Sequence, residues 1–269
     1  MEIKKIFNNE TSYLKHSLIV SKLKDKIKNY QNLEIILSEL PKGSILVGGF
    51  IRDLILDRLS LYPDIDIVIP NNSLDIGKDI AEKFSGKFLI LDQDRNIVRI
   101  IFRNFTVDIA SQTHELLAED LKSRDFTINS VGFSFNNEKL IDPAHGICDI
   151  NDSLLRSLRF KNLLDDPLRI LRCFRFVSEL NFHIEPSIFE FIKLNKFRLK
   201  TVSPERIQYE LKRIVQGKEA LKTVESLNEI RIFDWVQSYE NNHSNKLLHI
   251  NFDNFLQDEI DQFFPIAYL

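Results

Sequence analysis

Two aspartates stand two residues apart in the segment PDIDIVIP, where Asp64 and Asp66 alternate with isoleucines. Side chains two residues apart on a β-strand share a face, so both carboxylates are expected to project together while Ile65 and Ile67 face the core. Neighbouring carboxylates repel each other, and a shared divalent cation would stabilise them. Oxygen ligands with room for phosphate oxygens suit magnesium. The pattern predicts Asp64 and Asp66 as Mg²⁺ ligands and catalytic residues, although an isolated Asp-x-Asp is more often a turn cap or a solvated pair.

A glycine pair precedes these aspartates in the segment SILVGGFIRDLIL. Gly48 and Gly49 lie between an expected strand and an expected helix, where the absence of Cβ atoms lets the backbone approach a phosphate group. Arg52, one turn into the helix, adds a charged donor. Taken alone, the glycines indicate a turn, and Arg52 with Asp53 indicates an exposed helix face. In the order strand, glycine turn, helix and carboxylate strand, they predict nucleotidyl transfer, in which metal carboxylates act beside bound phosphates.

A third group of polar residues lies in the segment LLDDPLRILRCFRF. Asp166 stands where a helix N-cap is expected, and Pro167 suits the first helical position. Three arginines follow at three-residue steps and so lie near one face of the expected helix: Arg169, Arg172 and Arg175. The alternative interpretation is an N-cap followed by surface arginines on an amphipathic helix.

The elements that must position these residues follow from hydrophobic periodicity and turn residues. Up to residue 145 the pattern mixes helices with strands: a polar helix at 14–40, a strand at 44–49, a helix at 50–59, a strand at 64–70, a helix at 74–84 and three strands within 87–111. Beyond residue 149, only helical spacing recurs, at 165–180, 186–194, 204–216 and 219–236. The sequence therefore predicts an α+β head with a mixed sheet, followed by an all-helical region.

Composition limits the class of protein. With 269 residues, of which 43% are hydrophobic, the chain is long enough to bury a large core. No run approaches the roughly 20 apolar residues of a membrane span, and no apolar signal core is present at the start, so we expect a soluble, unexported protein. Residues 156–175 carry six basic and two acidic side chains, whereas 240–269 carry one basic and five acidic. A polyanionic partner is expected to bind the first of these segments.

A series of motifs resembles, in order and spacing, the bacterial-type (class II) tRNA nucleotidyltransferase and poly(A) polymerase family. The motifs are VGGFIRDLIL, PDIDIV, KSRDFTINSVGF, IDPAHGICDI, DDPLRILRCFRF and SPERIQYELKRI, and they cover about residues 42–235. The resemblance implies a head like the DNA polymerase β nucleotidyltransferase core, followed by a helical neck and a truncated body. The expected domains are an N-terminal helical extension (1–35), the head (36–150), the neck (151–235) and a short acidic remnant of the body (236–269).

The resemblance also implies roles for the motif residues. At the positions matching Asp166 and Arg169, the family reads the Watson–Crick edge of the incoming base. The arginines that follow approach its phosphates, and two residues of RDFTIN contact the nucleotide. The nucleotide-binding set implied in this way is Gly48, Gly49, Arg52, Arg124, Asp125, Asp166, Arg169, Arg172 and Arg175.

The function implied by the resemblance is a template-independent RNA 3′-end nucleotidyltransferase of the CCA-adding type. It would use Mg²⁺ to add C and/or A residues from CTP and ATP to tRNA, with release of pyrophosphate. The alternatives are a poly(A) polymerase, or an inactive relic of the family that still binds nucleotide or RNA. Because family members usually run well past 269 residues, a protein partner could replace the missing body and tail. We expect no membrane partner and a cytoplasmic location, or an organelle stroma if the gene is organellar.

Two smaller questions stay open at this point. Asp108, on an expected strand, could be a third acidic residue near the metals or a solvated strand position. Glu205, Arg206 and Glu210 lie at helical spacing in ERIQYEL, and we favour a surface salt-bridge face for them over a direct catalytic part.

Overall fold

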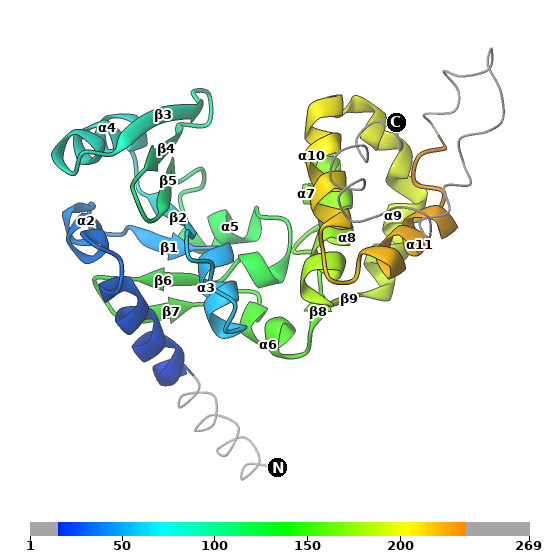
Figure 1. Ribbon diagram of the computed structural model, residues 1–269, viewed down its shortest axis with the longest axis horizontal. Helices are drawn as coiled ribbons and strands as arrows, with labels where there is room; N and C mark the ends of the chain where they lie inside the picture. Colours follow the sequence, from blue (N-terminus) through cyan, green and yellow to red (C-terminus); the bar gives the residue numbers. More distant parts are fainter. Residues whose placement is uncertain (1–15, 235–269) are drawn as a thin grey trace, which may run out of the picture. The chain divides into compact units, whose positions relative to one another are not determined.

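The computed structural model describes residues 16–234, and the chain divides into two compact units between Ile150 and Asn151 (Figure 1). The acidic remnant expected at 236–269, and the first part of the N-terminal extension expected at 1–35, lie outside the described residues. Within residues 16–234, no helix combines the length and the apolar character needed to cross a bilayer.

The first unit is built on a seven-stranded sheet in the order β3-β4-β5-β2-β1-β6-β7. β2 and β5 pair in parallel, and the other neighbours in the sheet pair antiparallel. The strands are β1 (Ile45–Val47), β2 (Asp64–Ile69), β3 (Lys87–Asp92), β4 (Ile97–Ile101), β5 (Thr106–Ser111), β6 (Gly132–Ser134) and β7 (Lys139–Ile141). The helices are α2 (Leu33–Glu39), α3 (Gly49–Ile55), α4 (Ser73–Lys83), α5 (Leu117–Lys122), the 3₁₀ turn η1 (Thr127–Asn129) and α6 (Gly146–Asn151). The mixed sheet with helices confirms the predicted fold class of the head.

The core of this unit centres on β1, which lies between β2 and β6. All three of its residues are buried, as expected of an apolar strand covered on both faces. Ile45 and Val47 pack with Val68 of β2 and with Leu121 of α5, while α4 covers β3, β4 and β5 (Figure 1). The strand that leads into the glycine turn is thus held at the centre of the sheet.

The single helix predicted over 14–40 is wrong. Residues 16–28 are helical, but the helix ends there and α2 begins only at Leu33. Asn32 between them has φ 68°, the left-handed conformation that Asn tolerates better than most residues and that stops a helix. The apolar spacing continues across the break, which is why periodicity alone missed it.

The second unit is mainly helical. Its elements are β8 (Leu154–Leu155), α7 (Phe160–Asp165), α8 (Leu168–Leu180), β9 (His183–Ile184), α9 (Pro186–Asn195), the 3₁₀ helix η2 (Lys196–Thr201), α10 (Pro204–Val215) and α11 (Ala220–Glu229). The expectation of helices alone needs one correction, because β8 and β9 form a short parallel pair. Helix α8 packs against α10 and α11 and buries Ile170, Leu171 and Phe174.

The helix predicted over 165–180 corresponds to α8, but α8 begins only at Leu168, and a separate helix, α7, ends at Asp165. Asp166, between them, has extended backbone angles (φ −134°, ψ 94°). Proline disfavours helical angles in the residue before it, so Pro167 forces this break. The first turn of α8 begins at Leu168, with Pro167 at the N-cap position predicted for Asp166. Asp166 still caps this turn, because its Oδ1 accepts a hydrogen bond from the Leu168 N–H at 3.3 Å.

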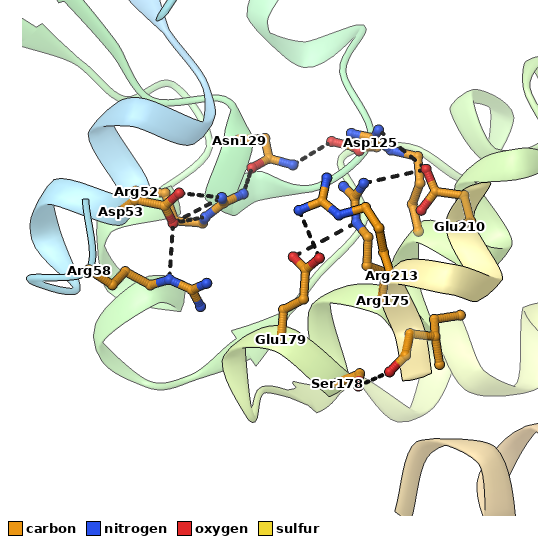
Figure 2. Close-up of polar contacts among 12 residues, drawn as sticks. Arg52, Asp53, Arg58, Asp125, Asn129, Arg175, Ser178, Glu179, Glu210 and Arg213 are labelled. Carbon is orange, nitrogen blue, oxygen red and sulfur yellow. Dashed lines mark hydrogen bonds and ion pairs between the residues drawn. The ribbon is translucent and has the colours of Figure 1, made fainter. Parts of the chain in front are cut away.

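Helices α8 and α10 approach closely at Gly217, just beyond the end of α10. A Cβ atom at this position would lie 2.7 Å from both the carbonyl carbon and the carbonyl oxygen of Ser178. The Ser178 hydroxyl donates to the Ile214 carbonyl at 2.5 Å, which joins the same two helices (Figure 2). Because the obstructing atoms are backbone, no side-chain movement can make room for a methyl group.

We therefore expect Gly217→Ala to force α8 and α10 apart and to lower the free energy of unfolding by about 1 to 3 kcal/mol, the usual range for overpacking. Thermal melts followed by circular dichroism would measure the loss. Gly132→Ala is the control, because its Cβ would meet the flexible end of Ile45 at 3.4 Å. Equal melting temperatures for the two variants would contradict the close approach.

Candidate functional site

The glycine turn after β1 brings three of the predicted residues together. Gly48 has φ 79°, a conformation that favours glycine, and its N–H donates to the Val131 carbonyl at 3.3 Å. A Cβ atom on Gly48 would lie 2.8 Å from Asp66 Oδ2 and 3.1 Å from Arg124 Nη1. The absence of a Cβ atom therefore lets a carboxylate and a guanidinium lie close against the backbone of this turn.

The two aspartates of β2 lie as the alternation predicts. Ile65 and Ile67 are buried, whereas Asp64 is exposed and Asp66 is half-buried. Antiparallel pairing places Asp66 opposite Val47, the residue before Gly48. The pairing of β1 with β2 thus sets the second carboxylate beside the glycine turn.

Asp108 is not a solvated strand residue. It lies opposite Asp66 in the parallel pairing of β2 and β5, and its two oxygens accept hydrogen bonds from Arg99 Nε and Nη2, each at 2.7 Å. The hydrogen bond to Asp108 raises the pKa of Arg99, and the charges of Asp64 and Asp66 add to this increase. Three acidic residues therefore lie on two adjacent strands, and Arg99 offsets the negative charge of one of them, Asp108.

The residues present fit a magnesium ion. Mg²⁺ is usually held by one or two carboxylates together with substrate phosphates and water, so Asp64 and Asp66 suffice as protein ligands. Among residues 16–234, no His, Cys, Asp or Glu side chains form a group of three or more suited to holding a metal. Asp108 accepts a hydrogen bond from Arg99 on each of its oxygens.

Arg52 belongs to a chain of polar contacts in the first unit (Figure 2). Its Nε and Nη2 donate to the two oxygens of Asp53 at 2.9 and 3.0 Å, and its Nη1 donates to Asn129 Oδ1 at 2.7 Å. Asn129 Nδ2 in turn donates to Asp125 Oδ1 at 2.9 Å. Arg52 is only 8% exposed, so the exposed helix face considered for it is wrong. Gly49 begins α3 close to this arginine, since a Cβ there would lie 3.4 Å from Arg52 Nη2.

The motif RDFTIN divides between the glycine turn and this polar chain. Arg124 is half-buried beside Gly48, whereas Asp125 is buried and also accepts the Phe126 N–H at 2.8 Å. Phe126 and Ile128 are fully buried and belong to the core of the first unit. Asp125 thus fixes the turn that places Arg124.

In the second unit, Asp166 and Arg169 lie at the start of α8. Asp166 pairs with Arg206 of α10, whose Nη2 donates to its two oxygens at 3.2 and 3.0 Å. Arg169 Nη1 donates to the Asn162 carbonyl at 3.3 Å, which ties the first turn of α8 to α7. Both predicted residues are partly exposed and restrained by neighbouring elements.

The arginines further along α8 enter a charged cluster with α10 (Figure 2). Arg175 Nη1 donates to Glu210 Oε1 at 3.4 Å, and Arg172 Nη1 lies 3.9 Å from the same oxygen. Glu179 pairs with Arg213 at 2.7 Å. Arg175 and Glu210 are 5% and 2% exposed, and burial lowers the pKa of Arg175 to about 10 and raises that of Glu210. Arg175 is therefore enclosed, whereas Arg172 is half-buried.

The surface salt-bridge face favoured for ERIQYEL is wrong for Glu210, which is buried. A signal for this burial was present in the sequence. Glu210 falls at the spacing of the apolar stripe of α10, three residues after Ile207 and four before Ile214, both of which are buried.

Two protein-family descriptions match the chain. "Poly A polymerase head domain" covers residues 44–156, and "Probable RNA and SrmB-binding site of polymerase A" covers residues 181–239. The first range contains the glycine turn, the β2 aspartates and RDFTIN, and the second contains α9 to α11.

Curated relatives and solved structures agree with these matches. The chain is 38% identical over 180 residues to a CC-adding tRNA nucleotidyltransferase of Synechocystis sp., covering 67% of this chain and 43% of the relative. It is 34% identical over 184 residues to a CC-adding tRNA nucleotidyltransferase of Geobacter sulfurreducens, covering 68% of this chain and 42% of the relative. A structure of a CCA-adding enzyme with CTP superposes with a TM-score of 0.68 at 29% identity, over 79% of this chain and 55% of that one. The chain thus spans about half the length of the relatives it matches.

The contacts of Arg52 predict a large stability effect. Arg52→Ala would leave Asp53 and Asn129 without their buried donor, and we expect the free energy of unfolding to fall by about 2 to 4 kcal/mol. Arg58→Ala is a matched control, because Arg58 pairs with the same Asp53 at 3.7 Å from a side chain that is 39% exposed. The Arg58→Ala substitution should lower the free energy of unfolding by less than about 1 kcal/mol. Thermal and urea denaturation would measure both, and similar losses would contradict a structural role for Arg52.

Proposed function

The chain belongs to the bacterial-type tRNA nucleotidyltransferase and poly(A) polymerase family, and from this membership we propose that it adds C and/or A residues to the 3′ end of tRNA. The substrates would be CTP, ATP and the terminal hydroxyl of the RNA, with pyrophosphate as the second product. One observation carries the proposal: because Gly48 has no Cβ atom, the Asp66 carboxylate and the Arg124 guanidinium both lie against the glycine turn. This arrangement offers metal ligands and a phosphate donor at one point of the sheet.

Each residue of the head has a separate part in the proposed reaction. Asp64 and Asp66 would hold Mg²⁺, which when bound activates the attacking hydroxyl and stabilises the leaving pyrophosphate. Arg124 would bind phosphate oxygens beside the turn at Gly48 and Gly49. Arg52 and Asp125 would act indirectly, since their contacts with Asn129 hold the turn and the RDFTIN segment together.

The second unit would recognise the base. Cytosine and adenine each present an amino donor beside a ring nitrogen acceptor, which a carboxylate at Asp166 and the donor-only guanidinium of Arg169 complement. Uracil and guanine would set a ring N–H against Arg169. Arg172 would be the arginine available to phosphates. Arg175 would support it indirectly, because both arginines pair with Glu210.

The RNA would be bound partly by the segment described as an RNA-binding site, residues 181–239. Its exposed basic residues include Arg198, Lys200 and Arg206.

The first functional prediction concerns the metal ligands. Asp64→Ala and Asp66→Ala should each reduce incorporation of labelled CMP or AMP into tRNA by about a thousandfold or more, because each removes a ligand worth several kcal/mol in the transition state. Calorimetric titration with Mn²⁺ should show loss of binding in both. Asp79→Ala, on an exposed position of α4, is the control. Near-normal turnover in either variant, with unchanged circular dichroism, would refute the assignment.

The second functional prediction concerns the choice of nucleotide. Wild-type protein, incubated with tRNA that ends before CCA, should incorporate C, A or both and discriminate against U and G by about tenfold to a hundredfold, the cost of one unpaired buried donor. Asp166→Ala and Arg169→Ala should each lose most of this discrimination. Unchanged preference in both would mean that the base is read elsewhere. Long A tracts on any RNA would instead identify a poly(A) polymerase, and no incorporation would identify a relic.

A further inference from the structure

Arg206 contacts the carboxylate to which base recognition is assigned, from a position 40 residues away in the chain. Its side chain is about half exposed, and that of Asp166 is 23% exposed. One nitrogen, Nη2, donates to both Asp166 oxygens, at 3.2 and 3.0 Å. The Leu168 N–H adds a third hydrogen bond, to Oδ1. The carboxylate is therefore held from two helices.

Stability is a weak explanation for this pair. Exposed ion pairs contribute about 0 to 1 kcal/mol, because solvent screens the charges and long side chains lose entropy. A role of Arg206 in orienting the Asp166 carboxylate explains the pair better. A carboxylate at a break between helices rotates about two side-chain torsions unless contacts restrain it, and here the break at Pro167 leaves Asp166 outside both α7 and α8.

We propose that Arg206 is a positioning residue that sets nucleotide discrimination by fixing the orientation of Asp166. The inference rests on the proposed function, in which Asp166 accepts a hydrogen bond from the amino group of cytosine or adenine. A carboxylate has about four lone-pair sites, and a single nitrogen between its two oxygens uses only the inner pair. Because the Leu168 N–H also donates to Oδ1, the outer lone pair of Oδ2 is the one available to the base, in a direction that Arg206 determines.

The same geometry explains why loss of Arg206 would relax the choice of base. A carboxylate that is free to rotate can turn toward the ring N–H of uracil and accept from it. The mismatch between that N–H and Arg169 would then be partly relieved. Binding of UTP should therefore suffer less than binding of CTP, or improve, when Arg206 is removed.

The experiment measures equilibrium binding of CTP and UTP, without RNA, by calorimetry in Mg²⁺. It compares wild type, Arg206→Ala, Arg206→Lys and the control Arg156→Ala. Arg156 pairs with Glu185 at 3.1 Å in the same unit, with side-chain exposures of 46% and 28% that resemble those of the Arg206 pair. Arg206→Ala should reduce the preference for CTP over UTP about fivefold, as expected for one net hydrogen bond. Arg206→Lys should restore part of the preference, and Arg156→Ala should keep the wild-type ratio.

Other outcomes separate this inference from the proposed function. Equal weakening of CTP and UTP in Arg206→Ala would overturn the inference, because it would mean that Arg206 binds phosphate. An unchanged ratio in Arg206→Ala, with a ratio that collapses in Asp166→Ala, would overturn the inference and leave base reading by Asp166 intact. A wild type that binds both nucleotides equally, or neither, would count against both. Melting temperatures within a few degrees of wild type would show that the variants are folded.

Discussion

Negative charge on two neighbouring strands is the constraint around which the head is arranged. Asp64 and Asp66 lie on β2, and Asp108 lies opposite Asp66 on β5. Adjacent strands are about 4.8 Å apart, where two like charges at an effective dielectric of about 20 repel by about 3 kcal/mol. Arg99 offsets the charge of Asp108 through two short hydrogen bonds. A cation beside the two aspartates of β2, as proposed, would reduce the repulsion between them in the same way.

In the second unit, positive and negative side chains pair with one another between two helices. Three arginines and two glutamates gather between α8 and α10: Arg172, Arg175, Glu179, Glu210 and Arg213. Buried pairs of this kind add little net stability, because desolvation cancels much of the attraction, but a misaligned pair is costly. The cluster therefore fixes the register of α8 against α10. Gly217 reinforces this register by allowing the two helices to touch just beyond the C-terminal end of α10.

What could be predicted from the sequence is what is local along the chain. The alternation in PDIDIVIP placed Asp64 and Asp66 on one side of a strand, and Pro167 carried a signal for the break between α7 and α8. The sequence carried no signal for the residues that these side chains contact. Asp108 and Arg99 meet only because β4 and β5 pair, and Arg206 reaches Asp166 only because α10 packs on α8. Such contacts depend on tertiary packing, which spacing does not encode.

The same difference between local and tertiary contacts applies to the residues proposed for the activity. The proposed metal ligands and the glycine turn lie within 19 residues of one another and share one hydrogen-bonded strand pair, whereas Arg124 comes from a distant segment of the chain. The proposed base recognition would depend on a contact between the start of α8 and the side of α10. A substitution on α10 would therefore change the orientation of the Asp166 carboxylate. Under this proposal, changes at the start of α8 and on α10 would alter the choice of nucleotide, whereas the carboxylates proposed to hold the metal lie on β2 of the head.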